Sequence, residues 1–297
     1  MKKFNTAVCK NRFRQLCLIG LLALLAGCSS LKLSYNHGET LLYWWLNAYV
    51  DLDADQKGWV KKDIDTLFQW HRQTQLKEYA QVLAQAQRQL QGNVTQAELL
   101  ADYADVRSRS QQLLLKAQPE LADLARALRP EQIAHLEKKF ASNNEDYRKK
   151  YLRGDTAKRQ KIRFKKAMEQ FELVFGGFGR EQEELIRRAS DARPLDNERW
   201  LEERQRRQRN IVNLVQKVQR DKLDKEATMA LINKLIKDTF ERIEQPEHKA
   251  FFDAHNEATA QMVLTVIKTA TPAQKNHAAK RLQGWIDDFN ALAAEAR

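Results

Sequence analysis

The most distinctive reactive side chain in this sequence is the thiol of Cys28. It follows a short apolar run at residues 16–25 and the two small residues Ala26 and Gly27. The run is shorter than the roughly 20 residues that cross a bilayer, and its length is typical of the apolar part of a secretory signal peptide. We therefore expect residues 1–27 to be a signal peptide, whose positive start contains Lys2, Lys3, Lys10, Arg12 and Arg14.

The segment Leu25-Ala26-Gly27-Cys28 resembles a bacterial lipobox. The resemblance implies that the thiol of Cys28 receives a diacylglycerol, that the signal is removed, and that the new amino group is acylated with a fatty acid such as palmitate. Several acyl chains anchor a protein much more firmly than one does. Ser29, where an Asp would imply retention in the inner membrane, implies the outer membrane and a domain facing the periplasm. The alternative, an ordinary signal peptide that happens to contain a cysteine, stays open.

Cysteine usage and charge restrict the function of residues 28–297. The other two cysteines, Cys9 and Cys17, lie in the signal, so we expect no disulfide and no paired-cysteine metal or redox site. Removing the signal leaves 46 basic and 39 acidic side chains, a net charge of +7. This excess favours anionic partners such as lipid headgroups, lipopolysaccharide or acidic polypeptides. An exported location argues against nucleic acid.

The other candidate residues do not complete a known metal-binding or phosphate-binding motif. Asp51, Asp53 and Asp55 begin like a calcium loop, but Gln56 and Lys62 occupy positions that require Gly and Glu. The histidines lack ligand-spaced partners, and the segment GGFG at 176–179 lacks the Lys-Ser/Thr of a phosphate loop. We therefore predict a protein that is not an enzyme and that needs no metal or cofactor.

A basic tract at residues 148–166 is the main candidate binding surface. It holds ten Lys and Arg side chains and one Asp. The aromatic and apolar residues Tyr147, Tyr151, Ile162 and Phe164 lie beside or between these charges. We interpret it as a concave basic face for acidic lipids, lipopolysaccharide or unfolded proteins, although a solvated helix surface stays open as the alternative. The candidate binding residues are Arg148, Lys149, Lys150, Arg163, Lys165 and Lys166.

The aromatic segment 39–50 allows three interpretations. Trp44 and Trp45 could sit at a membrane interface, where tryptophan rings are favoured. Alternatively, Trp45 and Tyr49 could pack in the core with Leu42, which is the interpretation that we prefer from the sequence because the segment lacks a Lys/Arg-rich face. In a third interpretation the two tryptophans are exposed and dock an envelope partner protein.

The composition predicts an all-α fold. Ala, Leu, Gln, Glu, Lys and Arg dominate residues 28–297, and apolar residues recur at spacings of three and four. We expect a lipidated tether at 28–38, then an antiparallel helical bundle in two possibly related halves, 39–176 and 177–297. The predicted helices are 39–50, 53–70, 72–91, 95–117, 119–128, 130–152, 155–175, 180–191, 195–220, 223–244, 247–269 and 272–295.

Four predicted helices begin with a glutamine at the fourth position of a capping sequence. In Thr271-Pro272-Ala273-Gln274 the glutamine side chain can reach back to the first backbone N–H. The other three are Gln56, Gln132 and Gln182. Their order along the chain, each pair separated by long helices, is consistent with an internal duplication.

These helix starts carry a resemblance to a known family. Residues 270–282 and, more loosely, 128–140 are similar to the Leu-Thr-x-x-Gln helix starts of the Spy/CpxP periplasmic chaperones, with Ala270 and Arg129 as departures. That resemblance implies a chaperone-like role in maintaining the cell envelope. The chain as a whole resembles bacterial lipoproteins of unknown function, through Tyr35-Asn36, residues 41–45 and Trp70-His71-Arg72.

Overall fold

The computed structural model describes residues 30–241 and 246–295, and within this part every regular element is a helix. The predicted all-α fold class is confirmed. The predicted signal peptide and Cys28 lie outside the described residues. In chain order the helices are α2 (Ser30–Asn36), α3 (Gly38–Val50), α4 (Ala54–Thr74), α5 (Leu76–Gln91), α6 (Gln96–Lys116), α7 (Gln118–Ala127), α8 (Pro130–Tyr147), the wider turn η1 (Arg148–Leu152), α9 (Thr156–Phe175), α10 (Arg180–Asp191), α11 (Asn197–Asp221), α12 (Lys225–Glu241), α13 (Pro246–Thr269) and α14 (Pro272–Ala294).

The predicted tether is wrong over most of its length, because residues 30–36 form α2. Tyr35 holds this helix against the rest of the protein. Its ring packs on the cluster around Leu76 and Leu292, and its hydroxyl lies 2.9 Å from Nδ1 of His71. The other predicted helix boundaries agree with the structure to within a few residues, and the predicted break at 176–179 separates α9 from α10. There Gly176 adopts a φ of 79°, which favours glycine.

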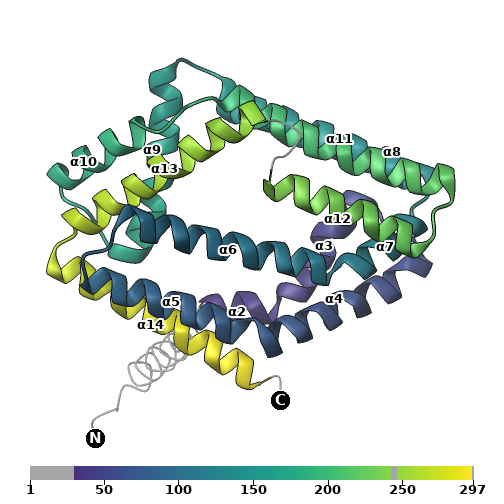
Figure 1. The fold of residues 1–297 in the computed structure, drawn as a ribbon, viewed down its shortest axis with the longest axis horizontal. Helices are drawn as coiled ribbons and strands as arrows, with labels where there is room; N and C mark the ends of the chain where they lie inside the picture. Colours follow the sequence, from purple (N-terminus) through teal and green to yellow (C-terminus); the bar gives the residue numbers. More distant parts are fainter. Residues whose placement is uncertain (1–29, 242–245, 296–297) are drawn as a thin grey trace, which may run out of the picture.

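The helices follow the edges of a flat frame, and α6 crosses its middle (Figure 1). Along the lower edge α5 and α14 run antiparallel, because Leu76 packs near Leu292 while Gln87 hydrogen-bonds to Gln283. Helices α8 and α11 pair in the same way, since Asn144 hydrogen-bonds to Gln208 and Glu137 to Gln216. Both pairs join residues 39–176 to residues 177–297, so the two predicted halves pack closely on each other.

Two large apolar clusters form the core. One contains side chains of α5, α9, α10, α13 and α14, with Ile186 and Val266 fully buried at its centre. The other joins α3 and α4 to α7, α8 and α11 around Val60, Ile133 and Val215. The helices therefore bury stripes at spacings of three and four, as an amphipathic helix requires.

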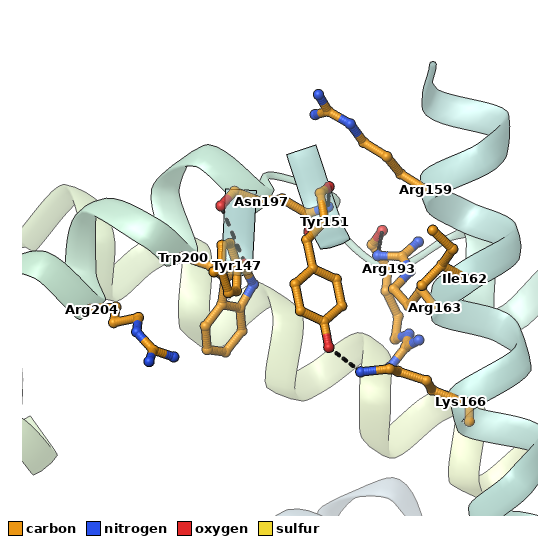
Figure 2. A pocket seen from close by; sticks show the side chains of 11 residues that line it. Tyr147, Tyr151, Arg159, Ile162, Arg163, Lys166, Arg193, Asn197, Trp200 and Arg204 are labelled. Atoms are coloured by element: carbon orange, nitrogen blue, oxygen red, sulfur yellow. Dashed lines mark hydrogen bonds between the residues drawn. The ribbon is translucent and has the colours of Figure 1, made fainter. Parts of the chain in front are cut away.

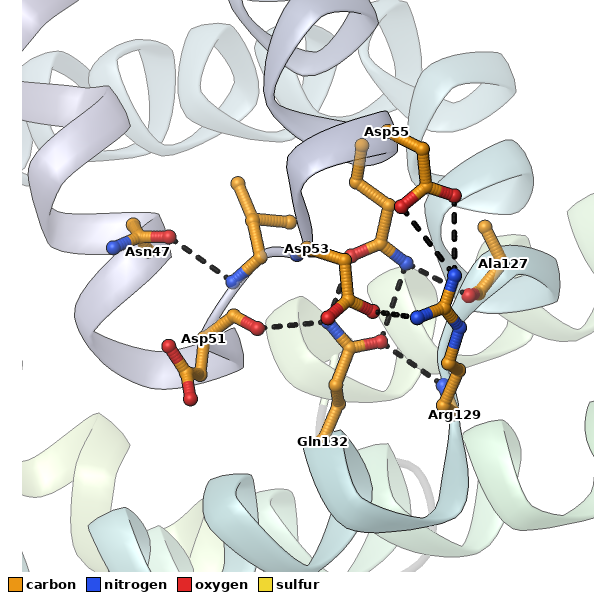
Figure 3. A network of polar contacts seen from close by, with 9 residues as sticks. Asn47, Asp51, Asp53, Asp55, Ala127, Arg129 and Gln132 are labelled. Carbon is orange, nitrogen blue, oxygen red and sulfur yellow. Dashed lines mark hydrogen bonds and ion pairs between the residues drawn. The ribbon is translucent and has the colours of Figure 1, made fainter.

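The four glutamine helix starts meet in two pairs. In the first pair, Nε2 of Gln56 donates to the backbone carbonyl of Ala127 at 2.8 Å, and Nε2 of Gln132 donates to that of Asp51 at 2.9 Å. The two amides also hydrogen-bond to each other, with the shorter contact at 2.7 Å. Each Oε1 accepts from the backbone N–H three residues earlier, at Asp53 and Arg129. Figure 3 shows how this network joins the starts of α4 and α8.

The second pair repeats the same hydrogen bonds. Nε2 of Gln182 donates to the carbonyl of Thr269, and Nε2 of Gln274 donates to that of Gly177, both at 2.7 Å. The two amides contact each other at 2.8 Å. In both pairs the accepting carbonyl lies two residues before the first residue of the partner's capping sequence. This shared pattern is consistent with the predicted internal duplication, which stays a prediction.

Candidate functional site

A cavity of about 530 Å³ lies where η1, α9 and the start of α11 meet. The fold brings these elements together because η1 contacts both α9 and α11. Figure 2 shows four cationic side chains along one side of the cavity, and the aromatic rings together with Arg204 along the other. The cations are Arg159, Arg163, Lys166, Arg193 and Arg204, and the rings are those of Tyr147, Tyr151 and Trp200. We call these eight residues the Tyr–Arg pocket.

Two guanidinium groups form the floor of the Tyr–Arg pocket. Arg163 donates to the carbonyls of Ser190, Arg193 and Pro194 at 2.8–3.1 Å, and so holds the end of α10. Arg193 is buried, with hydrogen bonds to the hydroxyl and the carbonyl of Ser190. Carbonyls at a helix C-terminus attract cations, which explains why these groups tolerate burial. Nε of Arg163 lacks a hydrogen-bond partner among the described residues.

The positive charge of the pocket is only partly balanced. None of the described side chains that line it is a carboxylate. Glu198 pairs with Arg159 at 2.8 Å, and Asp191 acts on Arg163 and Arg193 through its charge. Burial, and then the neighbouring charge of Arg163, lower the pKa of Arg193 to about 10, so it stays protonated at neutral pH. A ligand carboxylate or phosphate would therefore gain favourable electrostatic energy here.

The aromatic side of the pocket has two tyrosines in different environments. Their ring centroids are 4.8 Å apart. Burial raises the pKa of Tyr147 to about 12. Burial also acts to raise the pKa of Tyr151, but the hydrogen bond and charge of Lys166, with that of Lys150, lower it overall. The hydroxyl of Tyr151 therefore contacts the ammonium of Lys166.

Only two of the six predicted basic residues line the pocket. Arg163 and Lys166 lie one helical turn apart and share a face of α9, whereas Lys165 points away and is 78% exposed. Arg148 pairs with Glu145 at 3.5 Å, and Lys149 is exposed. The ammonium of Lys150 lies 5.6 Å from the ring centroid of Tyr151, next to the lining side chains.

Sequence reasoning missed four residues of the pocket. Arg159 belongs to the predicted basic tract and Arg204 to the cluster RQRRQR at 204–209, but nothing in the sequence joins the two segments. Arg193 and Trp200 come from the connection between α10 and α11 and from the first turn of α11. Trp200 packs edge-on against Phe252, with centroids 4.6 Å apart, so its position depends on α13.

Trp44 and Trp45 are exposed, at 63% and 56%. The preferred prediction that Trp45 packs in the core is therefore wrong. Leu42, Leu46 and Tyr49 do pack against the core, and Val50 is buried within it. The reason is helical geometry: only one side of α3 meets α4 and α8, and that side carries Leu42, Leu46 and Val50 rather than Trp44 and Trp45.

The aspartates at the start of α4, which begin like a calcium loop in the sequence, form ion pairs within the protein. Arg129 pairs with Asp53 at 2.6 Å and with Asp55 at 3.1 Å. Within the described residues, no group of three or more His, Cys, Asp or Glu side chains is arranged to hold a metal ion. The helices described here also include none that is both long and apolar enough to cross a membrane.

Comparison with known proteins identifies the family but not an activity. The part of the chain that the structure describes defines an all-helical protein. A model of a family of unknown function (DUF6279) matches residues 48–234, which is more than half of the chain. The chain belongs to this family. No curated protein and no solved structure matches the chain, and the likeness to the Spy/CpxP chaperones stays a prediction.

Proposed function

We propose that this chain is a lipid-anchored, periplasmic, non-enzymatic binding protein with a chaperone-like role in envelope maintenance. Its site is the Tyr–Arg pocket. The observation that carries the proposal is a cavity with five cations, three aromatic rings and no lining carboxylate among the described residues. The shared chemistry of its ligands is an acidic group next to an aromatic or apolar one.

An acidic polypeptide segment fits this chemistry best. Tyr147, Tyr151 and Trp200 offer stacking surfaces, while Lys166 and Arg204 reach the cavity from opposite sides (Figure 2). The pocket lies where α10 leads into α11, at the upper edge of the frame, whereas α2 lies at the lower edge (Figure 1). A site on the side away from the proposed anchor favours a ligand in the periplasm over the headgroups of the anchoring membrane.

Binding of an acidic peptide tests the pocket. We expect a blocked peptide of alternating phenylalanine and glutamate to change the fluorescence of Trp200, with the contribution of Trp200 isolated by comparison with the Trp200→Phe variant. A peptide with glutamine in place of glutamate should bind about tenfold more weakly, because the charge-assisted hydrogen bonds are lost. Lys166→Gln should weaken binding of the acidic peptide about fivefold, since it removes one exposed cation.

Lys165→Gln is the matched control for this experiment. It removes the same charge one residue away, on a side chain that is 78% exposed and does not line the pocket. We expect its affinity to stay within about twofold of the parent protein. Equal weakening by both variants would show a general charge effect, and equal affinity for the two peptides would also contradict the proposal.

The proposed anchor has its own test. We expect the Cys28→Ser chain to lose lipid attachment, to stay unprocessed, and to be absent from the outer-membrane fraction that holds the parent protein. The physical reason is that several acyl chains on one residue give a far firmer attachment than a single chain. Normal processing and unchanged fractionation of the variant would reject the lipoprotein assignment.

A second candidate function is a structural adaptor that docks an envelope protein through the aromatic helix 39–50. The exposure of Trp44 and Trp45 favours it, since such docking requires both rings to be accessible. A crosslinking capture from intact cells that depends on these two tryptophans would support this candidate.

A further inference from the structure

The four most exposed large hydrophobic side chains of the described residues all lie in α2 and α3. Leu33 is 57% exposed, Leu41 51%, Trp44 63% and Trp45 56%. The other exposed large hydrophobic side chains are at most 47% exposed and are scattered over α6, α9, α10 and α11. A cluster of exposed apolar groups on one part of a protein typically marks an interaction surface.

Helical spacing places the three residues of α3 on one side of that helix, and Leu33 precedes them on the neighbouring helix α2. Leu41, Trp44, Trp45 and Ala48 are exposed at spacings of three and four, and so share one side of α3. The exposed side chains of α3 also include Thr40 but none with a charge. Charged residues make up 30% of this chain, so an uncharged exposed helix face is unusual for it. We call Leu33, Leu41, Trp44 and Trp45 the apolar face.

We infer that the apolar face lies in the headgroup region of a lipid membrane and fixes the orientation of the protein on it. The inference rests on the proposed lipid anchor. Leu33 follows Cys28 by five residues, which span at most about 18 Å when fully extended. Acyl chains on Cys28 would therefore hold the apolar face close to the bilayer. Tryptophan rings are favoured at the boundary between headgroups and acyl chains.

A neighbouring helix supplies a cation that α3 lacks. The ammonium of Lys139, on α8, lies 5.9 Å from the ring centroid of Tyr49, and the ring of Tyr49 in turn contacts that of Trp45, with centroids 4.8 Å apart. An apolar surface with a lysine close to it is complementary to anionic lipid headgroups. This combination favours a lipid surface over a protein partner.

Quenching by brominated lipids tests the inference on the full-length protein. The protein is incorporated into vesicles of phosphatidylethanolamine and phosphatidylglycerol whose acyl chains carry bromine near the headgroup. We expect tryptophan fluorescence to be quenched, and we expect Trp44→Phe with Trp45→Phe to remove most of that quenching. Trp200→Phe with Trp285→Phe is the matched control and should leave the quenching in place, because neither ring belongs to the apolar face.

A second pair of variants keeps every tryptophan. Leu33→Ser with Leu41→Ser should lower the quenching at least twofold, because it removes apolar area that would enter the membrane. Leu173→Ser with Leu185→Ser changes two exposed leucines elsewhere and should have no effect. The inference is overturned if the vesicles do not quench the parent protein, or if the Trp44 and Trp45 variant is quenched as strongly as the parent.

These outcomes are independent of the test of the anchor. Loss of membrane fractionation on Cys28→Ser together with absent quenching would keep the anchor and reject the apolar face as a membrane contact. Normal processing of Cys28→Ser together with strong quenching through Trp44 and Trp45 would reject the anchor and support the membrane contact. In the first case, a protein partner on the apolar face becomes the explanation for its exposure.

Discussion

Replacing Arg206 by methionine is expected to lower the free energy of unfolding by about 3–5 kcal/mol. Arg206 is buried between Glu203 and Asp238, which are also buried. Its Nε lies 2.8 Å from a carboxylate oxygen of Glu203, and Nη1 pairs with Asp238 on α12. Methionine fills a similar volume but leaves two buried carboxylates without their shared cation. The large expected loss comes from removing the buried cation that these two carboxylates share.

The same network predicts a loss of stability in acid. Burial acts to raise the pKa of Glu203, but the hydrogen bonds from Arg206 and Arg207 outweigh it and lower the pKa below its ordinary value of 4.5. A carboxylate whose pKa is lower in the folded state stabilises that state above its unfolded pKa. This contribution is lost as the pH falls below about 4.5 and through the folded-state pKa. In Arg206→Met the pKa of Glu203 should rise, so that acid destabilises the variant less steeply than the parent.

Arg207→Met is the matched control for this prediction. Arg207 also donates to Glu203, at 2.7 Å, but is 34% exposed. Its replacement should cost about 1 kcal/mol or less, because a partly solvated pair contributes little. Denaturant unfolding followed by circular dichroism measures both variants over a range of pH. Equal losses for the two variants would contradict the proposed dependence on burial.

Gln132→Ala is expected to lower the free energy of unfolding by about 2–4 kcal/mol. The change removes a side chain that is 5% exposed and hydrogen-bonds to the amide of Gln56, the carbonyl of Asp51 and the N–H of Arg129. These groups lie in the interior, so water does not readily replace the lost partner. Unsatisfied buried polar groups cost about 1–3 kcal/mol each, and relaxation of the helix start recovers part of this cost.

The second glutamine pair provides the control within the same chain. Gln274 makes the same hydrogen bonds, to Gln182, the carbonyl of Gly177 and the N–H of Thr271, but it is only half-buried. Gln274→Ala should therefore cost about 1 kcal/mol, close to the value of a helix cap. Thermal unfolding of both variants measures the two losses of stability. A larger loss for Gln274→Ala than for Gln132→Ala would contradict the importance of burial.

Local sequence signals were sufficient to predict most helix boundaries. A capping sequence such as Thr95-Gln96-Ala97-Glu98 acts within four residues, and the structure shows its reciprocal hydrogen bonds at 2.8 and 3.2 Å. The start of α2 was not predicted, because its stability comes from contacts of Tyr35 with residues far along the chain. A helix of seven residues has little intrinsic stability, so its sequence carries little signal.

The candidate site was predictable only in part. The charge of the basic tract and the helical spacing of Arg163 and Lys166 are local properties. The other half of the pocket depends on where α11 lies relative to α9, and no pattern in a single sequence contains that information. The same applies to the glutamines: the sequence indicates four helix starts, whereas their pairing over 76 and 92 residues is visible only in the folded chain.

The sequence by itself determined the all-α fold class, most helix boundaries and an excess of positive charge, because short-range hydrogen bonding, side-chain spacing and composition fix these properties. It also carries the signal that predicts lipid attachment at Cys28. Only the tertiary structure decided which side of α3 faces solvent, which cation lies close to it and which charges enclose a cavity. Those properties depend on which helices pack together, and helix packing is set by the burial of apolar surface between segments that are distant in the chain.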